Sequence, residues 1–535
     1  MKKILTLLTA SVCALSVFAE VYSGKCGNNV NYTLNTDKGL LNIIGTGPME
    51  DYSSGGEAPW YPYQEYVKEI WLAKGITRIG NFAFWNCTKL PEIMIDETIS
   101  EVGDYAFSGC TALTRVYMSE DNLTTIGNYA FSFCGITSVT LPGTVTTIGE
   151  GAFSLCASLK RVTIPASVTS IGKMAFAFDI ALHLFCNMST SPQALQDDVF
   201  SNLEKANCKL FISASAETAY RSATEWKDMQ IVPLSGTAFH PCGDDLVWSF
   251  DPGSAVLSFI GSGAMDDIPN TQLVAENPDW WGNEFNKAIR TVEIPEGVTS
   301  IGEHAFKFCT NITSAPLPES IMTIGKWAFY ACRSLKTITI PRSVHSIGDL
   351  AFHDCKAMTD ILVDSNNSKY CSADGVLFDK AKTRLIQYPV ANSRKSYVIP
   401  SGVKEIAYYA FLTCQALESV TIPSSVEIIN DGAFQYCENL NTIYNYAAPI
   451  LIEASVFWGV DKPNCILYVP QQYYQAYLTE NVWKDFNVQI TDRGEAIDNI
   501  NHKSEIINHK FIKDGQVLIN RNGHVINVMG QPVQE

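Results

Sequence analysis

Short stretches in which apolar and polar residues alternate recur along this chain, and each is followed by a bend. In the stretch LKRVTIP, which ends at Pro165, Val162 and Ile164 are apolar and the residues beside them are polar. A period of two residues predicts a β-strand with one buried face. Pro165 ends the strand, because proline has no N–H to donate to a neighbouring strand.

The residues after each strand repeat a second pattern, which reads SVTSIGKMAF in the same copy. Val168 and Ile171 are expected to point inward, and Gly172 permits a bend that a side chain would obstruct. The small Ala175 lets neighbouring copies approach, and Phe176 fills the interior opposite the strand. Each unit is therefore predicted to contain a strand, a bend and a short irregular or helical return.

Copies of this unit follow one another at intervals of 22 to 24 residues, measured between the cysteines that follow Ala-Phe. These cysteines are Cys87, Cys110, Cys134, Cys156, Cys309, Cys332, Cys355, Cys414 and Cys437. A fixed period of this length indicates a solenoid. One unit cannot bury its apolar positions alone, whereas stacked units bury them against each other. The predicted fold is an α/β repeat: a leucine-rich-repeat solenoid with a parallel sheet of short strands, two arrays in tandem and a small β-rich tail.

The repeated cysteine is interpreted as a small buried side chain that packs against the turning backbone. A disulfide ladder is disfavoured because equivalent positions of stacked units point the same way. A zinc site is disfavoured because the close cysteine pairs typical of zinc ligands are missing from the sequence. After Cys156 the next unit has Asp179 at this place.

A duplication on a larger scale divides the chain. The segment from Cys26 resembles the segment from Cys242, and the segments ending near Trp226 and Trp483 also resemble each other. In both closing segments a strand is expected to precede an amphipathic helix that ends at the tryptophan. Solenoids need atypical ends to cover the first and last units. We therefore expect one array with caps at residues 20–235 and a second at 236–492.

Two further segments depart from the repeat. The spacing from Cys355 to Cys414 is 59 residues, and we expect a hairpin with strands on either side of Lys380–Thr383, inserted at about residues 364–400. The insertion belongs either to a binding face or to decoration of one unit. Residues 493–535 are predicted to form short strands around the turns Asp514–Gly515 and Asn522–Gly523.

The N-terminus and the composition bear on location. Lys2 and Lys3 precede an apolar run, and the pattern at residues 1–19 predicts a secretory signal peptide. A lipoprotein acylated at Cys13 is the alternative. No other segment has the 18 consecutive apolar residues of a membrane-spanning helix. The net charge of −17 over 535 residues disfavours nucleic acid as a partner.

Candidate contacts for a ligand lie on the outward face of the predicted strands, which is rich in hydroxyl groups. This ribbon includes Arg115, Tyr117, Arg161, Thr163, Thr337, Thr339, Thr421 and Tyr444. Such a surface suits extended contact with a protein or glycan, although threonine is also simply a good strand residue. Trp60 and Trp281 precede the two arrays, where they either contact a ligand or pack on the first unit.

No motif of a known catalytic site occurs in the sequence, and the eight histidines are scattered over different units and the tail. We expect no enzymatic activity, no cofactor and no metal. A hydrolase with an unfamiliar site is a less favoured alternative.

The copies of LKRVTIPASVTSIGKMAF and the opening GITRIGNFAFWNC resemble the BspA-type leucine-rich repeats of secreted bacterial surface proteins, over about residues 60–490. The resemblance implies a solenoid exposed outside the cell, either secreted or associated with the outer membrane. It also implies adhesion to an extracellular protein of a host matrix or another cell. A carbohydrate-associated binding or scaffold protein is the alternative function. Residues 511–531 resemble C-terminal sorting segments of exported Bacteroidetes proteins, and a plain terminal hairpin is the alternative.

Overall fold

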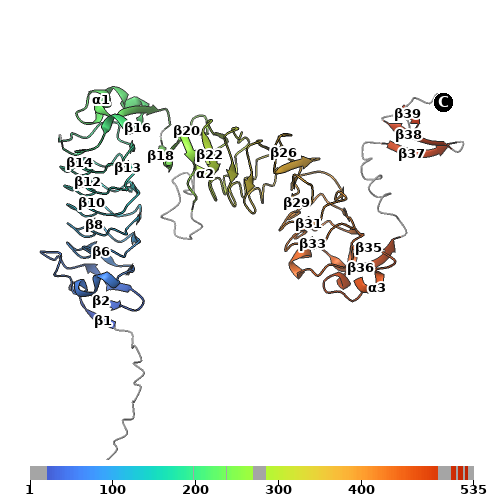
Figure 1. The fold of residues 1–535 in the computed structure, drawn as a ribbon, viewed down its shortest axis with the longest axis horizontal. Coiled ribbons are helices and arrows are strands. Elements are labelled where there is room, and N and C mark those ends of the chain that lie inside the picture. Colours follow the sequence, from blue (N-terminus) through green and yellow to red (C-terminus); the bar gives the residue numbers. More distant parts are fainter. Residues whose placement is uncertain are drawn as a thin grey trace, which may run out of the picture. The chain divides into compact units, whose positions relative to one another are not determined.

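The computed structural model describes residues 21–196, 198–236, 238–268 and 285–491, together with three strands between residues 508 and 527. The chain divides into two compact units, residues 1–235 and 236–535. Figure 1 shows coils stacked along each unit. The predicted signal peptide and Trp281 lie outside the described residues.

Most coils of the first unit contribute one strand to each of two separate rows of parallel strands, and the strands of the second row are short. The longer strands are β7 (Glu92–Ile95), β9 (Arg115–Met118), β11 (Ser138–Thr140), β13 (Arg161–Ile164), β15 (Leu184–Asn187), β16 (Lys209–Ser213) and β17 (Gln230–Leu234). The other row consists of β4 (Gly47–Pro48), β6 (Ile76–Ile79), β8 (Glu101–Val102), β10 (Thr125–Ile126), β12 (Thr147–Ile148) and β14 (Ser170–Ile171). The predicted parallel solenoid is confirmed, and its returns are turns rather than α-helices.

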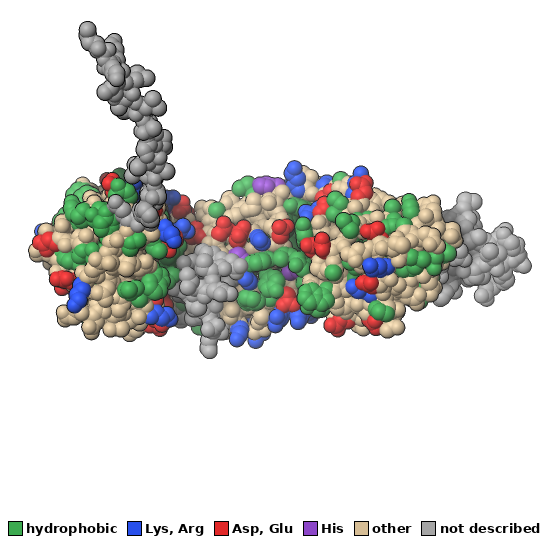
Figure 2. Space-filling view, turned by 90° about the horizontal axis from the view of Figure 1, so that it is seen from below, with side chains coloured by type: hydrophobic (Ala, Val, Ile, Leu, Met, Phe, Trp, Pro, Cys, Tyr) green, Lys and Arg blue, Asp and Glu red, His purple; other side chains and the backbone are tan. Residues whose placement is uncertain are grey.

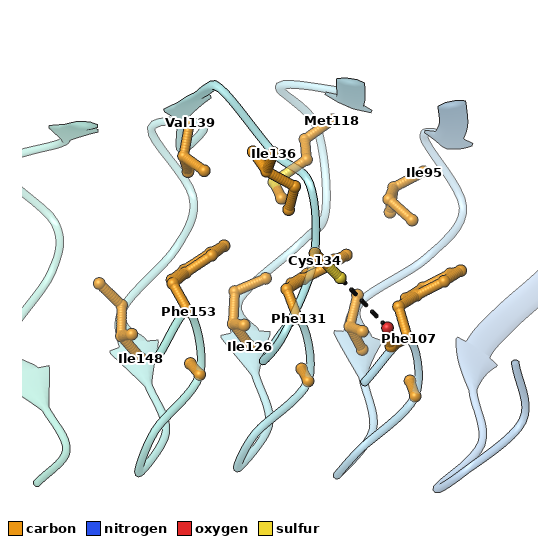
Figure 3. Close-up of a cluster of buried hydrophobic side chains, with 14 of the residues drawn as sticks. Ile95, Phe107, Met118, Ile126, Phe131, Cys134, Ile136, Val139, Ile148 and Phe153 are labelled. Carbon is orange, nitrogen blue, oxygen red and sulfur yellow. Dashed lines mark hydrogen bonds between the residues drawn. The ribbon is translucent and has the colours of Figure 1, made fainter. Parts of the chain in front are cut away.

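The interior lies between the two rows and is filled by the apolar positions of the repeat (Figure 3). Phe107, Phe131 and Phe153 are fully buried and their rings stack, with centroids 5.2 and 5.5 Å apart. Gly172 lies where the bend of one coil touches the preceding one, and a Cβ there would collide with the backbone nitrogen of Glu150. Side-chain size at these positions therefore sets how closely the coils stack.

The repeated cysteines link each coil to the coil before it. Six of the nine repeated thiols donate a hydrogen bond to the carbonyl oxygen of the buried phenylalanine one coil earlier, at 2.9–3.2 Å, as drawn for Cys134 and Phe107 in Figure 3. The pairs are Cys110–Phe84, Cys134–Phe107, Cys156–Phe131, Cys332–Phe306, Cys355–Phe329 and Cys437–Phe411. The described cysteines are free thiols, and most are buried. The interpretation of these cysteines as buried packing residues is confirmed.

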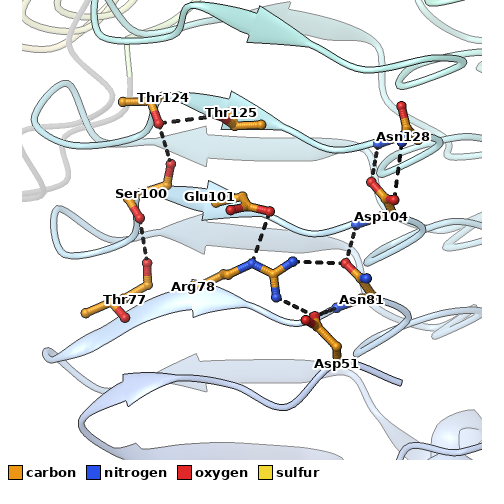
Figure 4. Close-up of polar contacts among 10 residues, drawn as sticks. All are labelled: Asp51, Thr77, Arg78, Asn81, Ser100, Glu101, Asp104, Thr124, Thr125 and Asn128. Carbon is orange, nitrogen blue, oxygen red and sulfur yellow. Dashed lines mark hydrogen bonds and ion pairs between the residues drawn. The ribbon is translucent and has the colours of Figure 1, made fainter. Parts of the chain in front are cut away.

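A second ladder of side chains joins the coils on the surface of the first unit (Figure 4). Asp51 accepts a hydrogen bond from the amide of Asn81, Asn81 accepts one from Asp104, and Asp104 accepts one from Asn128, at 2.7–2.8 Å. Each side chain satisfies a main-chain N–H of the next coil, which would otherwise need a water partner. The ladder therefore fixes the bend of each coil to its neighbour.

Caps close both ends of the first unit. At its start, β1 (Val21–Lys25), β2 (Val30–Asn35), β3 (Leu40–Gly45) and β5 (Glu69–Leu72) form a sheet, and the 3₁₀ turn η1 (Tyr61–Tyr66) precedes β5 in the chain. At its end lie η2 (Lys205–Asn207), η3 (Ala214–Ala216), α1 (Glu217–Ser222) and η4 (Trp226–Asp228). The predicted helix ending at Trp226 is wrong in extent: it ends at Ser222. Glu225 has a left-handed backbone (φ 69°), which a continuing helix cannot contain.

The second unit repeats this plan. Its first sheet contains β18 (Ala238–Gly243), β19 (Asp245–Asp251), β20 (Val256–Ala264), β21 (Thr291–Glu293), β22 (Val298–Ile301), β23 (Thr323–Ile324) and β25 (Ser346–Ile347), with α2 (Phe285–Ala288) between β20 and β21. β24 (Thr337–Ile340) pairs with β26 (Asp360–Val363). The later long strands are β30 (Ser396–Val398), β32 (Ser419–Ile422), β34 (Thr442–Asn445), β35 (Ile466–Pro470) and β36 (Asn487–Thr491).

The end of the second unit matches the end of the first. It contains η7 (Ala454–Phe457), η8 (Lys462–Asn464), α3 (Tyr474–Tyr477) and η9 (Trp483–Asp485). The expected helix up to Trp483 ends at Tyr477 instead, because Val482 has a left-handed backbone (φ 68°). The indole N–H groups of Trp226 and Trp483 donate to the carbonyls of Gln193 and Ile450, at 3.1 and 2.8 Å.

The insertion in the second unit forms a meander of three strands, β27 (Tyr370–Ala373), β28 (Val376–Asp379) and β29 (Arg384–Gln387). The strands predicted on either side of Lys380–Thr383 are β28 and β29. β29 then pairs in parallel with β31 (Glu405–Ile406), which pairs with β33 (Ile428–Ile429). In the tail, β37 (Asn508–Lys513), β38 (Gln516–Arg521) and β39 (His524–Asn527) form an antiparallel sheet.

We expect the buried thiols to resist alkylation in the folded protein. Burial raises the pKa of the Cys87 thiol to about 12, so little reactive thiolate forms at pH 8. Cys371 is the one partly exposed cysteine among the described residues and should react first with iodoacetamide. Mass spectrometry of peptides after alkylation, with and without urea, checks this. Buried cysteines reacting as fast as Cys371 without urea would contradict it.

We expect Asp179→Asn to stabilise the protein increasingly as the pH rises. The carboxyl of Asp179 accepts the Cys156 N–H at 2.8 Å, and burial raises its pKa to about 8. In the unfolded chain the pKa is about 3.9. The free energy of unfolding of the wild type therefore falls from about pH 4 to pH 8, by at most about 1.4 kcal/mol per pH unit. The asparagine of the variant does not titrate. Urea unfolding at pH 5 and pH 8 measures the difference, and the exposed control Asp37→Asn should show none.

Candidate binding surface

The outward face of the long strands in the first unit presents Arg115 and Tyr117 next to each other on β9. Arg115 is exposed and forms an ion pair with Glu92, its neighbour on β7, at 3.2 Å. Tyr117 is half-buried and lies beside Met94. This part of the predicted ribbon offers a charged pair and an aromatic ring to solvent.

Further along the same face, the ribbon is covered. Arg161 is half-buried, and Thr163 is 0% exposed. Thr163 pairs with Cys186 on β15, and Cys186 pairs with Phe211 on β16. Both of these outward-face residues are also buried. The assignment of Thr163 as a ligand contact is therefore wrong in this structure, because its side chain is buried.

In the second unit, Thr337 and Thr339 are both exposed on β24. Their neighbours on β26 are Asp360 and Leu362, and Leu362 is also exposed. The hydroxyl groups here face solvent as expected, beside one acidic and one apolar side chain.

Thr421 on β32 is buried, so it is not a surface contact either. Its neighbours at the same register are Val398 on β30 and Tyr444 on β34. Tyr444 is half-buried and its ring stacks on Tyr468, with centroids 4.9 Å apart. These larger side chains flank the small threonine on both sides.

Trp60 is 1% exposed and packs on the first coil. Its ring stacks on Phe84 with centroids 5.7 Å apart, and its indole N–H donates to the carbonyl of Ala83 at 2.8 Å. Of the two interpretations of Trp60, packing is confirmed and ligand contact is wrong, because the ring ends the interior phenylalanine stack.

The structure also shows an apolar stripe that the sequence-based reasoning missed. Phe133 is 54% exposed, Phe178 is 36% exposed and Ile180 is 73% exposed. Phe133, Leu155 and Phe178 take the same place in three successive coils, two residues after the buried phenylalanine. The amide of Phe133 bonds to the carbonyl of Ser154, and that of Leu155 to Ala177, so the coils lie side by side.

The backbone at this place explains why these side chains point outward. Phe133, Leu155 and Phe178 have φ between 58° and 66°, the left-handed region. Asn86 and Gly109 take this place in earlier coils, and both tolerate the conformation at lower cost. Phe133, Leu155 and Phe178 therefore adopt a backbone conformation that is unfavourable for bulky side chains. Bulky apolar residues within the motif AF-x-x-C are the signal that could have identified the stripe.

Exposed aromatic residues occur in the second unit as well. Phe308 and Tyr436 take the same place in their coils, and Trp458 lies 6.2 Å from Tyr436 between ring centroids. On the face drawn in Figure 2, apolar, basic and acidic side chains are interspersed, without a block of one charge sign. Such a surface does not favour a polyanion.

Within the described ranges, no group of three or more His, Cys, Asp or Glu residues is arranged to hold a metal ion. The same part of the chain contains no helix with the length and apolar character needed to cross a bilayer.

Comparison with protein families matches residues 63–213, 284–381 and 387–470 to the family described as "BspA type Leucine rich repeat region (6 copies)". The chain belongs to the BspA-type leucine-rich-repeat family. The matched ranges of this leucine-rich-repeat protein include both arrays. No curated protein sequence matches it.

Three solved structures similar to this leucine-rich-repeat protein come from bacteria. A leucine-rich repeat protein from Eubacterium ventriosum is 22% identical over 82% of this chain and 95% of its own, with a TM-score of 0.30. A leucine rich cell surface protein from Faecalibacterium prausnitzii is 19% identical over 90% of this chain and 97% of its own, with a TM-score of 0.31. A leucine-rich repeat protein from Bacteroides ovatus is 19% identical over 87% of this chain and 99% of its own, with a TM-score of 0.26. These global similarities carry no argument about partners.

We expect Arg115→Ala to leave the stability of this leucine-rich-repeat protein nearly unchanged. Both members of the Arg115–Glu92 pair are more than one-third exposed, and such pairs contribute about 0–1 kcal/mol. Urea unfolding of the variant and the wild type measures the change. A loss above about 2 kcal/mol would show that the pair is a structural contact and unsuitable as a probe of binding.

Proposed function

We propose that this protein binds another protein through the apolar stripe of its first unit, without catalysis. The observation that carries the proposal is the row of the exposed Phe133, the half-buried Leu155 and the exposed Phe178 on successive coils, extended by the exposed Ile180. Contiguous exposed apolar side chains are typical of protein interaction sites. Aromatic side chains contribute most to the affinity of such sites.

The proposal includes a place outside the cell and a role in adhesion. Family membership supports a surface role, and the apolar run after Lys2 and Lys3 supports export. On the ribbon, the exposed Arg115, Thr337 and Thr339 and the half-buried Tyr117 add polar contacts on the strand faces. A host matrix protein or a protein of another cell surface fits this combination of apolar and polar contacts.

Binding to immobilised matrix and cell-surface proteins tests the proposal. We expect the double variant Phe133→Asn/Phe178→Asn to lose at least tenfold in affinity for any partner found, because the partner loses two apolar anchors. Asparagine suits the left-handed backbone and already stands at Asn86, so the fold should persist. Surface plasmon resonance on the full chain provides the measurement.

Ile44→Asn is the matched control, because Ile44 is a similarly exposed apolar residue of the first unit outside the stripe. It should bind as the wild type does. Equal affinities of the double variant and the control would contradict the proposed site, even if a partner is found.

A glycan partner is a second candidate, favoured by the exposed ring of Trp458 close to Tyr436. Flat aromatic rings stack on sugar faces, and a shallow cavity of about 520 Å³ adjoins Trp458. A glycan array probed with the wild type and with Trp458→Ala distinguishes the candidates. Sugar binding that the substitution abolishes would favour the glycan.

A further inference from the structure

A ladder of main-chain hydrogen bonds joins the turns of successive coils in the second unit. The amide of Trp327 donates to the carbonyl of Asp349, and that of Phe329 donates to Ala351, at 3.1 and 2.8 Å. After the insertion the ladder resumes, with Phe411 donating to Ala433. In each case a carbonyl of the following coil satisfies an amide near the buried phenylalanine.

The ladder is interrupted after the coil that contains Phe352. Among the described residues, the amides of Leu350 and Phe352 have no hydrogen-bond acceptor, and Phe352 is buried. Buried amides without a protein partner are rare, and water or a ligand usually satisfies them.

The cause is a turn that is two residues too short. The step from the short strand to the buried ring is five residues from Ile324 to Phe329, whereas the step from Leu385 to Tyr388 is only three. Tyr388 takes the place of the phenylalanine, since its amide donates to Ala410 and its ring stacks on Phe411. The short turn lacks the residues that would supply carbonyls to the preceding coil.

A cavity of about 60 Å³ lies beside this gap. Its lining includes Leu350, Phe352, His353, Arg384, Gln387 and Ala407. His353 is 3% exposed, and its Nε2 lies 2.9 Å from the carbonyl oxygen of Tyr409, so Nε2 carries the hydrogen. Its Nδ1 is buried and has no partner among the described residues, and burial lowers the pKa of the ring to about 4.

The polar groups of the cavity include both donors and an acceptor. Leu350 and Phe352 supply N–H groups, and the neutral ring of His353 supplies an acceptor at Nδ1. Arg384 already pairs with Glu405 at 2.9 Å, and the exposed Asp349 also lines the cavity, so an anion gains little there. A neutral group that accepts and donates matches this set, as a peptide group of the missing turn would.

We propose that this cavity is a binding site for a carboxamide group, from a small amide or from an asparagine or glutamine side chain. The carbonyl oxygen accepts from the amide of Phe352, and the NH₂ group donates to Nδ1 of His353. The volume suits one such group and excludes a longer peptide. The site is separate from the apolar stripe and does not depend on the proposed function.

Titration of the full chain with acetamide, followed by ligand-detected NMR, tests the proposal. We expect saturable binding of acetamide that is at least tenfold tighter than that of acetate. Comparing Gly-Asn-Gly with Gly-Ala-Gly identifies the source of the carboxamide. The two peptides should differ in affinity only if the asparagine side chain can enter the cavity. Either result for the peptides leaves the site itself supported by acetamide.

Two variants fill the cavity in different ways. Insertion of Gly-Asn between Ile386 and Gln387 restores the five-residue step, and Ala407→Leu places a larger side chain in the lining. Both should lose acetamide binding at least tenfold, and circular dichroism verifies their fold. Absence of saturable binding by the wild type, equal binding by a folded filled variant, or tighter binding of acetate would overturn the proposal.

Discussion

Hydrogen bonds from one coil to the next are the interaction on which the rest of this structure depends. A coil alone leaves the amides of its turn and the edges of its strands without partners, and its phenylalanine without cover. Stacking supplies these partners through the backbone, the Asn and Asp ladder and the thiols of most repeated cysteines. Because the contacts are between neighbours, stability accumulates along the array.

This dependence explains why the repeated residues are poor indicators of chemistry. A cysteine at one place in most coils suggests a reactive or metal-binding row, but most of these thiols donate to a carbonyl of the preceding coil. Where Asp179 replaces the cysteine, its carboxyl group also contacts the preceding coil, but it accepts a hydrogen bond there, from the amide of Cys156. This position of the coil takes a small polar side chain. Which residue occurs there depends on which neighbouring main-chain group needs a hydrogen-bond partner.

The repeat period, the strand pattern and the cap positions could be predicted from the sequence because they follow from local alternation and from duplication. The exposure of single outward residues could not. Thr163 and Thr339 have the same place in the strand pattern, yet one is buried and one exposed, because that difference depends on packing beyond the coil itself. The stripe at Phe133 and the short turn before Tyr388 also required the structure, since both depend on comparing equivalent places in stacked coils.

The thiol ladder also affects how easily the chain is oxidised while it folds. A thiol within an array is buried in the folded protein, so it is protected from oxidants only after the coils around it have docked. Trp226 and Trp483 close the ends of the arrays, because their rings cover the last aromatic layer of each array. A chain that stopped before such a segment would keep an open end that could crosslink to other molecules.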